Sequence, residues 1–133
     1  MAQIISVANQ KGGVGKTTTT VNLGACLASL GKKVLLVDMD AQGNATSGVG
    51  IRKPDVTRDI YDVLVNELPI DEATLITEHE NLSIVPATLQ LAGAEIELTS
   101  MMARESRLKG SLAEVSSQYD YILIDCPPSL GHL

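Results

Sequence analysis

Gln-Lys-Gly-Gly-Val-Gly-Lys-Thr-Thr, residues 10–18, stands between a short apolar run at 4–8 and a helical pattern from Lys16 to about Leu30. An apolar run of this length is typical of a strand buried on both faces of a parallel sheet. The glycines allow backbone N–H groups to turn toward a ligand, and the following helix adds the positive end of its dipole. The stretch therefore predicts a phosphate-binding loop between a strand and a helix.

Two residues of this loop would carry its chemistry. Lys16 would contact the β- and γ-phosphates of a nucleotide, and the Thr17 hydroxyl would bind Mg²⁺. The loop departs from the standard pattern, because Gln10 stands where the first glycine is expected and Lys11 adds a second lysine at the entrance. A glycine-rich turn with solvated lysines is one alternative. A dinucleotide fingerprint is another, but Thr18 replaces its third glycine.

The remainder of the chain alternates strand and helix patterns, which indicates an α/β fold. Buried strands are expected at 34–37, 82–85 and 121–124, and strand-helix-strand units imply right-handed crossovers between parallel strands. We expect one domain over residues 1–133, with a doubly wound, mainly parallel sheet and helices on both faces. Together with the phosphate-binding loop, this arrangement resembles the N-terminal part of the P-loop NTPase fold.

The segments between the strands predict one loop and several helices. Residues 41–50 hold three glycines and no apolar period, so a ligand loop is expected there, at the carboxyl end of the second strand. Helices are expected at 57–64 with Thr57 as cap, at 71–77 with Asp71 as cap, and across 90–117 with a break near 100–106.

Composition narrows the class of protein. Hydrophobic residues make up 44% of the chain and charged residues 20%, which is typical of a soluble globular domain. The net charge of −6 argues against a broad nucleic-acid surface, because phosphate neutralisation needs clustered Lys and Arg. No apolar run approaches the ~20 residues that span a bilayer. A cytoplasmic protein is expected, and Cys26 and Cys126 suit a reducing compartment.

Three aspartates stand at the expected strand ends. Asp38 and Asp40 are two residues apart where the second strand opens, so both would point to the same side if the strand geometry persists. Asp125 follows the apolar run at 122–124, as expected of a residue that holds Mg²⁺ through water. Aspartates that only cap the next turn are the alternative at these positions.

Three spaced segments together resemble the deviant phosphate-loop ATPases of the ParA and MinD class. They read Lys-Gly-Gly-Val-Gly-Lys-Thr-Thr at 11–18, Val-Leu-Leu-Val-Asp-Met-Asp-Ala-Gln-Gly-Asn-Ala-Thr at 34–46, and Tyr-Ile-Leu-Ile-Asp-Cys-Pro-Pro-Ser-Leu at 121–130. Residues 86–98, between the second and third segments, resemble the chromosomal ParA proteins called Soj.

The resemblance implies a Mg²⁺-dependent ATPase and assigns its residues. ATP binding falls to Lys11, Gly12, Gly13, Val14, Gly15, Lys16, Thr17 and Thr18. Magnesium falls to Thr17, Asp38 and Asp125, and catalysis to Lys11, Lys16 and Asp40. Asp40 would position the attacking water rather than act as a strong base, because an ordinary aspartate is too acidic for that role.

The resemblance also implies partners and an output. ATP would bring two subunits face to face, with Lys11 of each reaching the other's phosphates. The ATP state would control non-specific DNA binding through residues beyond Leu133, a ParB-type protein would stimulate hydrolysis, and no membrane contact is expected. The ATP-bound form would sit on the nucleoid and serve chromosome or plasmid segregation.

Family members are longer, so we expect the N-terminal portion of such a protein, with negligible hydrolysis by the 133-residue chain alone. A MinD-like division-site ATPase and a module that holds nucleotide without turnover are the alternatives. A nitrogenase-reductase-like enzyme would need cluster-ligating cysteines, an arrangement that Cys126 directly after Asp125 does not resemble.

Overall fold

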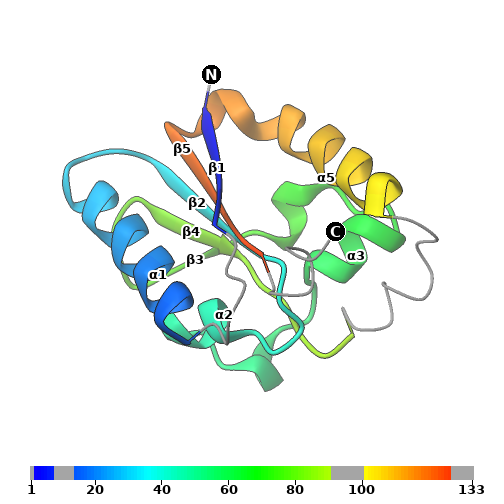
Figure 1. The fold of residues 1–133 in the computed structure, drawn as a ribbon, viewed down its shortest axis with the longest axis horizontal. Helices are drawn as coiled ribbons and strands as arrows, with labels where there is room; N and C mark the ends of the chain where they lie inside the picture. Colours follow the sequence, from blue (N-terminus) through cyan, green and yellow to red (C-terminus); the bar gives the residue numbers. More distant parts are fainter. Residues whose placement is uncertain (1, 8–13, 91–100, 127–133) are drawn as a thin grey trace.

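The computed structural model describes residues 2–7, 14–90 and 101–126, with the side chains of 14–17 and 101–105 outside the description. Five strands form one sheet in the order β1-β5-β2-β4-β3 (Figure 1). The strands are β1 (Gln3–Val7), β2 (Val34–Asp38), β3 (Leu75–Ile76), β4 (Leu82–Val85) and β5 (Tyr121–Asp125). The pairs β1–β5, β5–β2 and β2–β4 are parallel, and only β3 runs antiparallel to its neighbour β4. The expected mainly parallel α/β fold is confirmed.

Helices cover both faces of this sheet. In Figure 1, α1 (Val14–Ser29) and α2 (Asn44–Gly48) lie on one face, and α3 (Ile60–Val65) and α5 (Met101–Val115) lie on the other. Short 3-10 turns lie between these elements at Lys53–Asp55 (η1), Ile70–Ala73 (η2) and Ser116–Gln118 (η3). Within the described ranges, no helix combines the length and the hydrophobicity needed to cross a bilayer.

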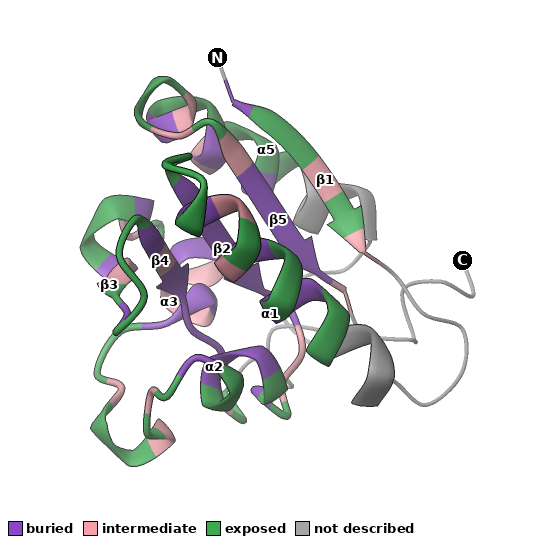
Figure 2. Cartoon of the chain, turned by 90° about the vertical axis from the view of Figure 1, so that its left-hand side faces the viewer, coloured by how far each residue is buried: buried purple, intermediate pink, exposed green. Residues whose placement is uncertain are grey.

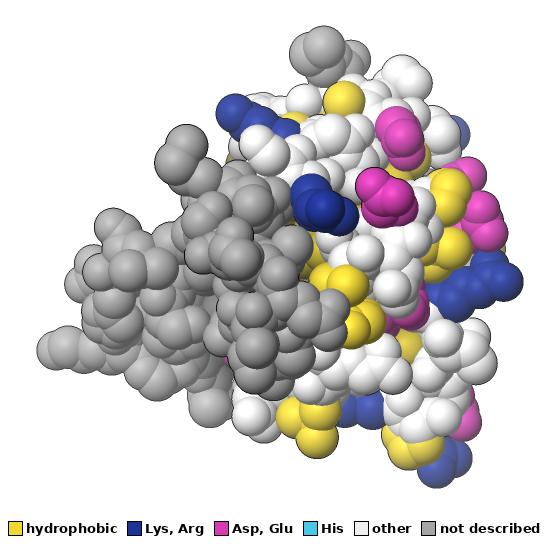
Figure 3. Space-filling view, turned by 90° about the vertical axis from the view of Figure 1, so that its right-hand side faces the viewer, with side chains coloured by type: hydrophobic (Ala, Val, Ile, Leu, Met, Phe, Trp, Pro, Cys, Tyr) yellow, Lys and Arg dark blue, Asp and Glu magenta, His cyan; other side chains and the backbone are white. Residues whose placement is uncertain are grey.

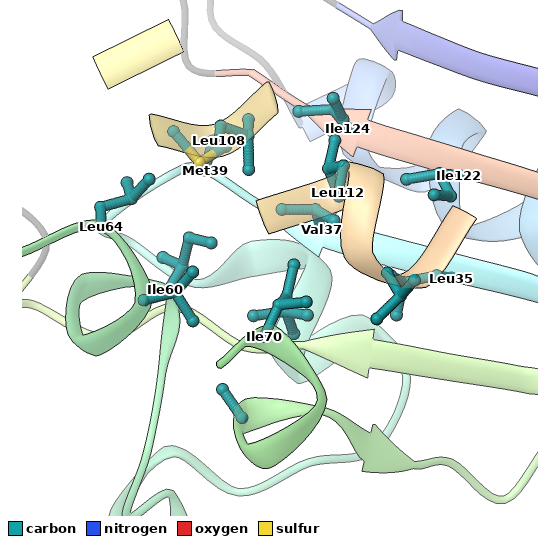
Figure 4. Close-up of a cluster of buried hydrophobic side chains, with 14 of the residues drawn as sticks. Leu35, Val37, Met39, Ile60, Leu64, Ile70, Leu108, Leu112, Ile122 and Ile124 are labelled. Carbon is teal, nitrogen blue, oxygen red and sulfur yellow. The ribbon is translucent and has the colours of Figure 1, made fainter. Parts of the chain in front are cut away.

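Each face of the sheet carries its own hydrophobic cluster. Leu35 and Val37 of β2 contribute to the cluster under α3 and α5, whereas Val34 and Leu36 contribute to the cluster under α1. Figure 4 shows the first cluster, in which Leu108 and Leu112 of α5 lie over the strands, together with Ile60, Leu64 and Ile70. Because successive side chains of a strand point to opposite faces, a strand covered on both sides reads as a continuous apolar run.

The edge strand β1 differs from the strands inside the sheet. Figure 2 shows β2, β4 and β5 mostly buried and β1 mostly exposed. Among the described residues only β5 pairs with β1, with Gln3 opposite Tyr121 and Val7 opposite Asp125.

Helix α1 lies unusually close to the sheet at Gly24, which is buried. A Cβ atom at this position would lie 3.0 Å from Cδ2 of Leu36 and 3.3 Å from Cδ1 of Leu82. Glycine therefore sets the distance between α1 and the strands. Gly31, with φ +88, follows α1 in the left-handed conformation expected of a residue that ends a helix.

Two expectations for the region after β2 are wrong. Residues 41–50 were expected as a loop, but they contain the short helix α2, which begins after Gly43 in the left-handed conformation. The amide and hydroxyl of Thr46 both bond to a buried carboxylate, a tertiary contact that local pattern does not report. Asp59, not Thr57, caps α3, and it forms a capping box with Asp62.

Two further expectations also fail. Instead of a helix over 71–77, the chain makes the short turn η2 and then β3, which pairs with β4. Pairing with the sheet ends the helical turn, a case in which tertiary contact overrides local propensity. α5 runs unbroken from Met101 to Val115, so the expected break near 100–106 is absent from its described part, and residue 100 lies outside the described residues. Residues 91–100 of the expected helical segment lie outside the described residues.

Candidate functional site

Three parallel strands end side by side at one edge of the sheet. Val7 of β1 is opposite Asp125 of β5, which is in turn opposite Asp38 of β2. Backbone hydrogen bonds continue past these residues, from Cys126 N to Val7 O at 2.9 Å and from Met39 N to Asp125 O at 2.9 Å. Ligands bind at the carboxyl ends of strands in open α/β sheets, so this edge is the candidate site.

The described residues on either side of the expected phosphate loop belong to β1 and α1. β1 ends at Val7, and α1 begins at Val14 and packs against β2 and β5. Val14, Gly15, Lys16 and Thr17 therefore form the first turn of α1, where backbone N–H groups without helical partners can receive an anion. The next residue of α1, Thr18, is exposed. Lys11, Gly12 and Gly13 lie outside the described residues.

Asp38 and Asp125 form a pair of buried carboxylates on neighbouring strands. Their exposed fractions are 0% and 1%. Burial raises the pKa of Asp38 to about 6, hydrogen bonds from Thr46 and Asp40 oppose that rise, and the negative charge of Asp125 adds to it. Positive charge beside two buried acidic groups would stabilise their ionised forms. Carboxylate oxygens are the ligands that Mg²⁺ prefers, so the pair fits a magnesium site.

The Asp38 carboxylate also organises the chain that follows β2. Its Oδ1 accepts a hydrogen bond from Asp40 N at 3.1 Å. Its Oδ2 accepts two bonds from Thr46, from the amide N at 2.9 Å and from Oγ1 at 2.7 Å. Both carboxylate oxygens are thus held by residues of the segment between β2 and α3. The turn-capping role that was the alternative for Asp38 is present. It leaves Oδ1 able to accept one further contact, because each oxygen has two lone pairs and Oδ2 already accepts two bonds.

Asp40 lies in a different environment from Asp38. The strand geometry that would place both on the same side ends at Asp38, and Asp40 begins a tight turn and is partly exposed. Its Oδ1 accepts a hydrogen bond from Gln42 N at 3.0 Å, and its carbonyl accepts one from Gly43 N at 2.8 Å. Lys53 Nζ donates to the carbonyl of Gln42. The turn that carries Asp40 is therefore fixed by its own hydrogen bonds and by the contact from Lys53.

One residue of this site was not singled out from the sequence. Thr46 is fully buried and joins the Asp38 carboxylate to the amide of Ala87, which follows β4. Local pattern does not separate Thr46 from its exposed neighbour Ser47, since both stand in a polar run without apolar period. The one signal was the family-like segment at 34–46, which ends at Thr46. Its role depends on a contact between segments 41 residues apart.

Comparison with known proteins places this geometry in a family. A family profile described as an AAA domain matches residues 2–133. The chain is 62% identical to the sporulation initiation inhibitor protein Soj of Bacillus subtilis (strain 168) over 133 residues, which is 100% of this chain and 53% of Soj. It is 54% identical to the chromosome partitioning protein ParA of Myxococcus xanthus (strain DK1622), over 100% of this chain and 47% of that protein. The chain thus spans about half the length of these curated relatives.

A solved structure supports the same assignment. The cobyrinic acid a,c-diamide synthase from Mycobacterium smegmatis, with bound ADP and magnesium, matches with a TM-score of 0.89 and 40% identity. The match covers 98% of this chain and 53% of the synthase chain. The profile, the two relatives and the shared sheet all cover the strands that end at Asp38 and Asp125. The chain therefore belongs to the AAA-domain family of the matched profile, and it is similar to Soj and to the chromosome partitioning protein ParA.

Proposed function

We propose that this chain is the ATP-binding and ATP-hydrolysing part of a ParA-type switch protein, which serves chromosome or plasmid segregation through an ATP-dependent dimer. The observation that carries the proposal is the buried carboxylate pair Asp38 and Asp125 at the edge from which β1 leads into α1. A P-loop site needs an anion-binding helix start and an acidic metal-binding strand end together. The ADP and magnesium of the structural relative support this combination.

Each residue then has a defined task. The first turn of α1 would receive the phosphates through its backbone N–H groups, with Lys16 adding charge and Thr17 a metal ligand. Asp38 and Asp125 would hold the metal side of the site. Bound Mg²⁺ would neutralise charge that develops on the transferred phosphoryl group. Asp40, at the turn after β2, would orient the attacking water.

Lys11 completes the proposed site from the other subunit. A second cation at the phosphates stabilises the transition state of phosphoryl transfer. Dimerisation on ATP would therefore switch hydrolysis on, and a ParB-type protein would increase its rate further. The relatives named as partitioning proteins support this context.

DNA association in the ATP-bound state, and with it nucleoid localisation, is assigned to residues outside this chain. On the described part of the face in Figure 3, basic and acidic side chains are interspersed rather than gathered into a broad basic patch. The chain as a whole has 16 acidic and 10 basic residues, a balance that does not favour a broad basic surface. A non-specific DNA site needs clustered cations to release counterions.

One observation favours a second candidate, a module that holds nucleotide without turnover. The hydrogen bond from Gln42 N holds Oδ1 of Asp40, the residue proposed to orient water, toward its own turn. For ATP to be hydrolysed, the Asp40 carboxylate must contact the attacking water while it keeps or exchanges the hydrogen bond from Gln42 N. The two candidates differ in one measurable step, the release of phosphate.

Phosphate release by the full-length protein with Mg²⁺ and ATP tests the proposal. Asp40→Ala is expected to retain ATP and to slow hydrolysis at least about a hundredfold, which corresponds to about 2.7 kcal/mol of barrier. The variant should accumulate as an ATP-bound dimer in sedimentation. Equal rates in the wild type and in Asp40→Ala would refute the catalytic role of Asp40, and no release by either would favour the holding module.

A further inference from the structure

The hydroxyl of Thr46 connects two segments of the site that are far apart in the sequence. Oγ1 lies 2.7 Å from Oδ2 of Asp38 and 3.0 Å from the amide N of Ala87. A hydroxyl has one donor and two acceptor positions. Because the Ala87 N–H can only donate, the hydroxyl accepts from Ala87 and gives its own proton to the carboxylate. The direction of both bonds is therefore determined.

The segment that Thr46 contacts is itself fixed on its far side. Ile60 N, at the start of α3, donates to the carbonyl of Pro86 at 2.9 Å. Thr88 Oγ1 donates to Oδ2 of Asp59, the buried cap of α3, at 2.5 Å. Residues 86–88 are thus bonded to α2 on one side and to the N-terminus of α3 on the other. The segment that bonds to Thr46 is therefore itself held in place by α3.

We propose that Thr46 is a positioning residue for the ATPase reaction, which holds the Asp38 carboxylate in one orientation and joins it to the segment after β4. The inference rests on the proposed function. Two donors from one residue, amide and hydroxyl, bond the same oxygen of Asp38, so the carboxylate cannot rotate freely. Groups that orient a metal-binding carboxylate affect metal affinity and rate although they touch neither metal nor substrate.

Two substitutions separate the hydroxyl from the volume of the side chain. Thr46→Val keeps the shape and removes both hydroxyl bonds, whereas Thr46→Ser keeps the hydroxyl. Ser47→Ala is the matched control, because Ser47 is exposed on the same short helix. All three are made in the full-length protein.

Steady-state kinetics give the first readout. Thr46→Val is expected to lower kcat, and to raise the Mg²⁺ concentration needed for half-maximal rate, by about 10- to 100-fold. KM for ATP should change much less, because the phosphate contacts of α1 remain. Thr46→Ser and Ser47→Ala should stay near the wild type in all three quantities.

Amide exchange of the nucleotide-free protein gives a second readout that needs no turnover. Ala87 is fully buried and its N–H has the Thr46 hydroxyl as acceptor, so its exchange should be faster in Thr46→Val and slow in Thr46→Ser. If Thr46→Val does not fold, Thr46→Cys serves the same comparison, since its thiol is only a weak donor.

The outcomes are distinct. Faster exchange at Ala87 together with a wild-type kcat and Mg²⁺ requirement would overturn the inference, because the hydroxyl would then be structural only. Equal kinetics for the Ser and Cys variants would overturn it as well. A wild-type protein that releases no phosphate overturns the proposed function and this inference with it, and that result needs no Thr46 variant.

Discussion

The close contact between α1 and the sheet makes Gly24→Val the sharpest test of how the phosphate site is supported. The Cβ alone would lie 3.0 Å from Leu36 Cδ2, 3.3 Å from Leu82 Cδ1 and 3.6 Å from Leu123 Cδ1, and valine adds two methyl groups beyond it. Overpacking of this kind costs about 1–3 kcal/mol. Valine regains only about 0.3 kcal/mol of helix propensity over glycine. The net loss of unfolding free energy should be about 0.7–2.7 kcal/mol.

A second helical glycine provides the control. Gly110 of α5 is exposed, and a Cβ there would meet no heavy atom within 4 Å. Gly110→Val should therefore be neutral or more stable by about 0.3 kcal/mol, from propensity alone. Urea unfolding of the two variants of the full-length protein measures the difference directly. The wild type supplies the reference midpoint and slope.

ATP affinity should differ between the two variants in the same direction as their stability. α1 carries Lys16 and Thr17 in its first turn, so a helix pushed away from the strands moves the expected phosphate contacts. Calorimetric titration with Mg²⁺ and ATP should show weaker binding for Gly24→Val and unchanged binding for Gly110→Val. Equal unfolding midpoints for the two variants, with equal ATP affinity, would refute the close packing of α1 as the support of the site.

Three further outcomes are expected. Lys16→Ala should remove most ATP affinity and all turnover, and unchanged affinity in calorimetry would exclude the phosphate-loop assignment. Lys11→Ala should bind nucleotide as a monomer but fail to dimerise, so a dimer with a non-hydrolysable analogue in sedimentation would argue against a role across the subunit interface. The 133-residue chain by itself should self-associate without nucleotide and bind ATP more weakly than the full-length protein, because β1 is paired on one side among the described residues and Ile4 is 47% exposed. Ile4→Lys should reduce the light scattering, and a monodisperse monomer with full-length affinity would contradict this expectation.

The inner strands β2, β4 and β5 were predictable from the sequence for a simple reason. They lie between two layers of helices, so their residues are mainly apolar, and β2 and β5 end in an aspartate. The apolar runs at 34–37, 82–85 and 121–124 therefore predicted β2, β4 and β5 within a residue. The start of α1 was predictable from glycines and the residues that follow them. The roles of Lys11, Lys16 and Asp40 remain predictions.

The short elements were less predictable because long-range contacts form them. β3 has two residues, and it exists as a strand through pairing with Ile84 and Ser83 of β4. The cap of α3 had a local signal, the reciprocal pair Asp59 and Asp62, that was available in the sequence and was missed. α2 had no such signal, since polar residues of a loop and of a short helix look alike.

The sequence by itself determined the family, the α/β class and the edge of the sheet that holds the candidate site, because glycine-rich turns and strand-end aspartates are local features. Only the tertiary structure decided how Asp38 and Asp40 differ. Both aspartates follow the same apolar strand, yet Asp38 is buried and bonded to Thr46, whereas Asp40 is partly exposed and caps its own turn. The physical reason is that burial and hydrogen-bond partners come from α2 and from the segment after β4, which meet β2 only in the folded chain.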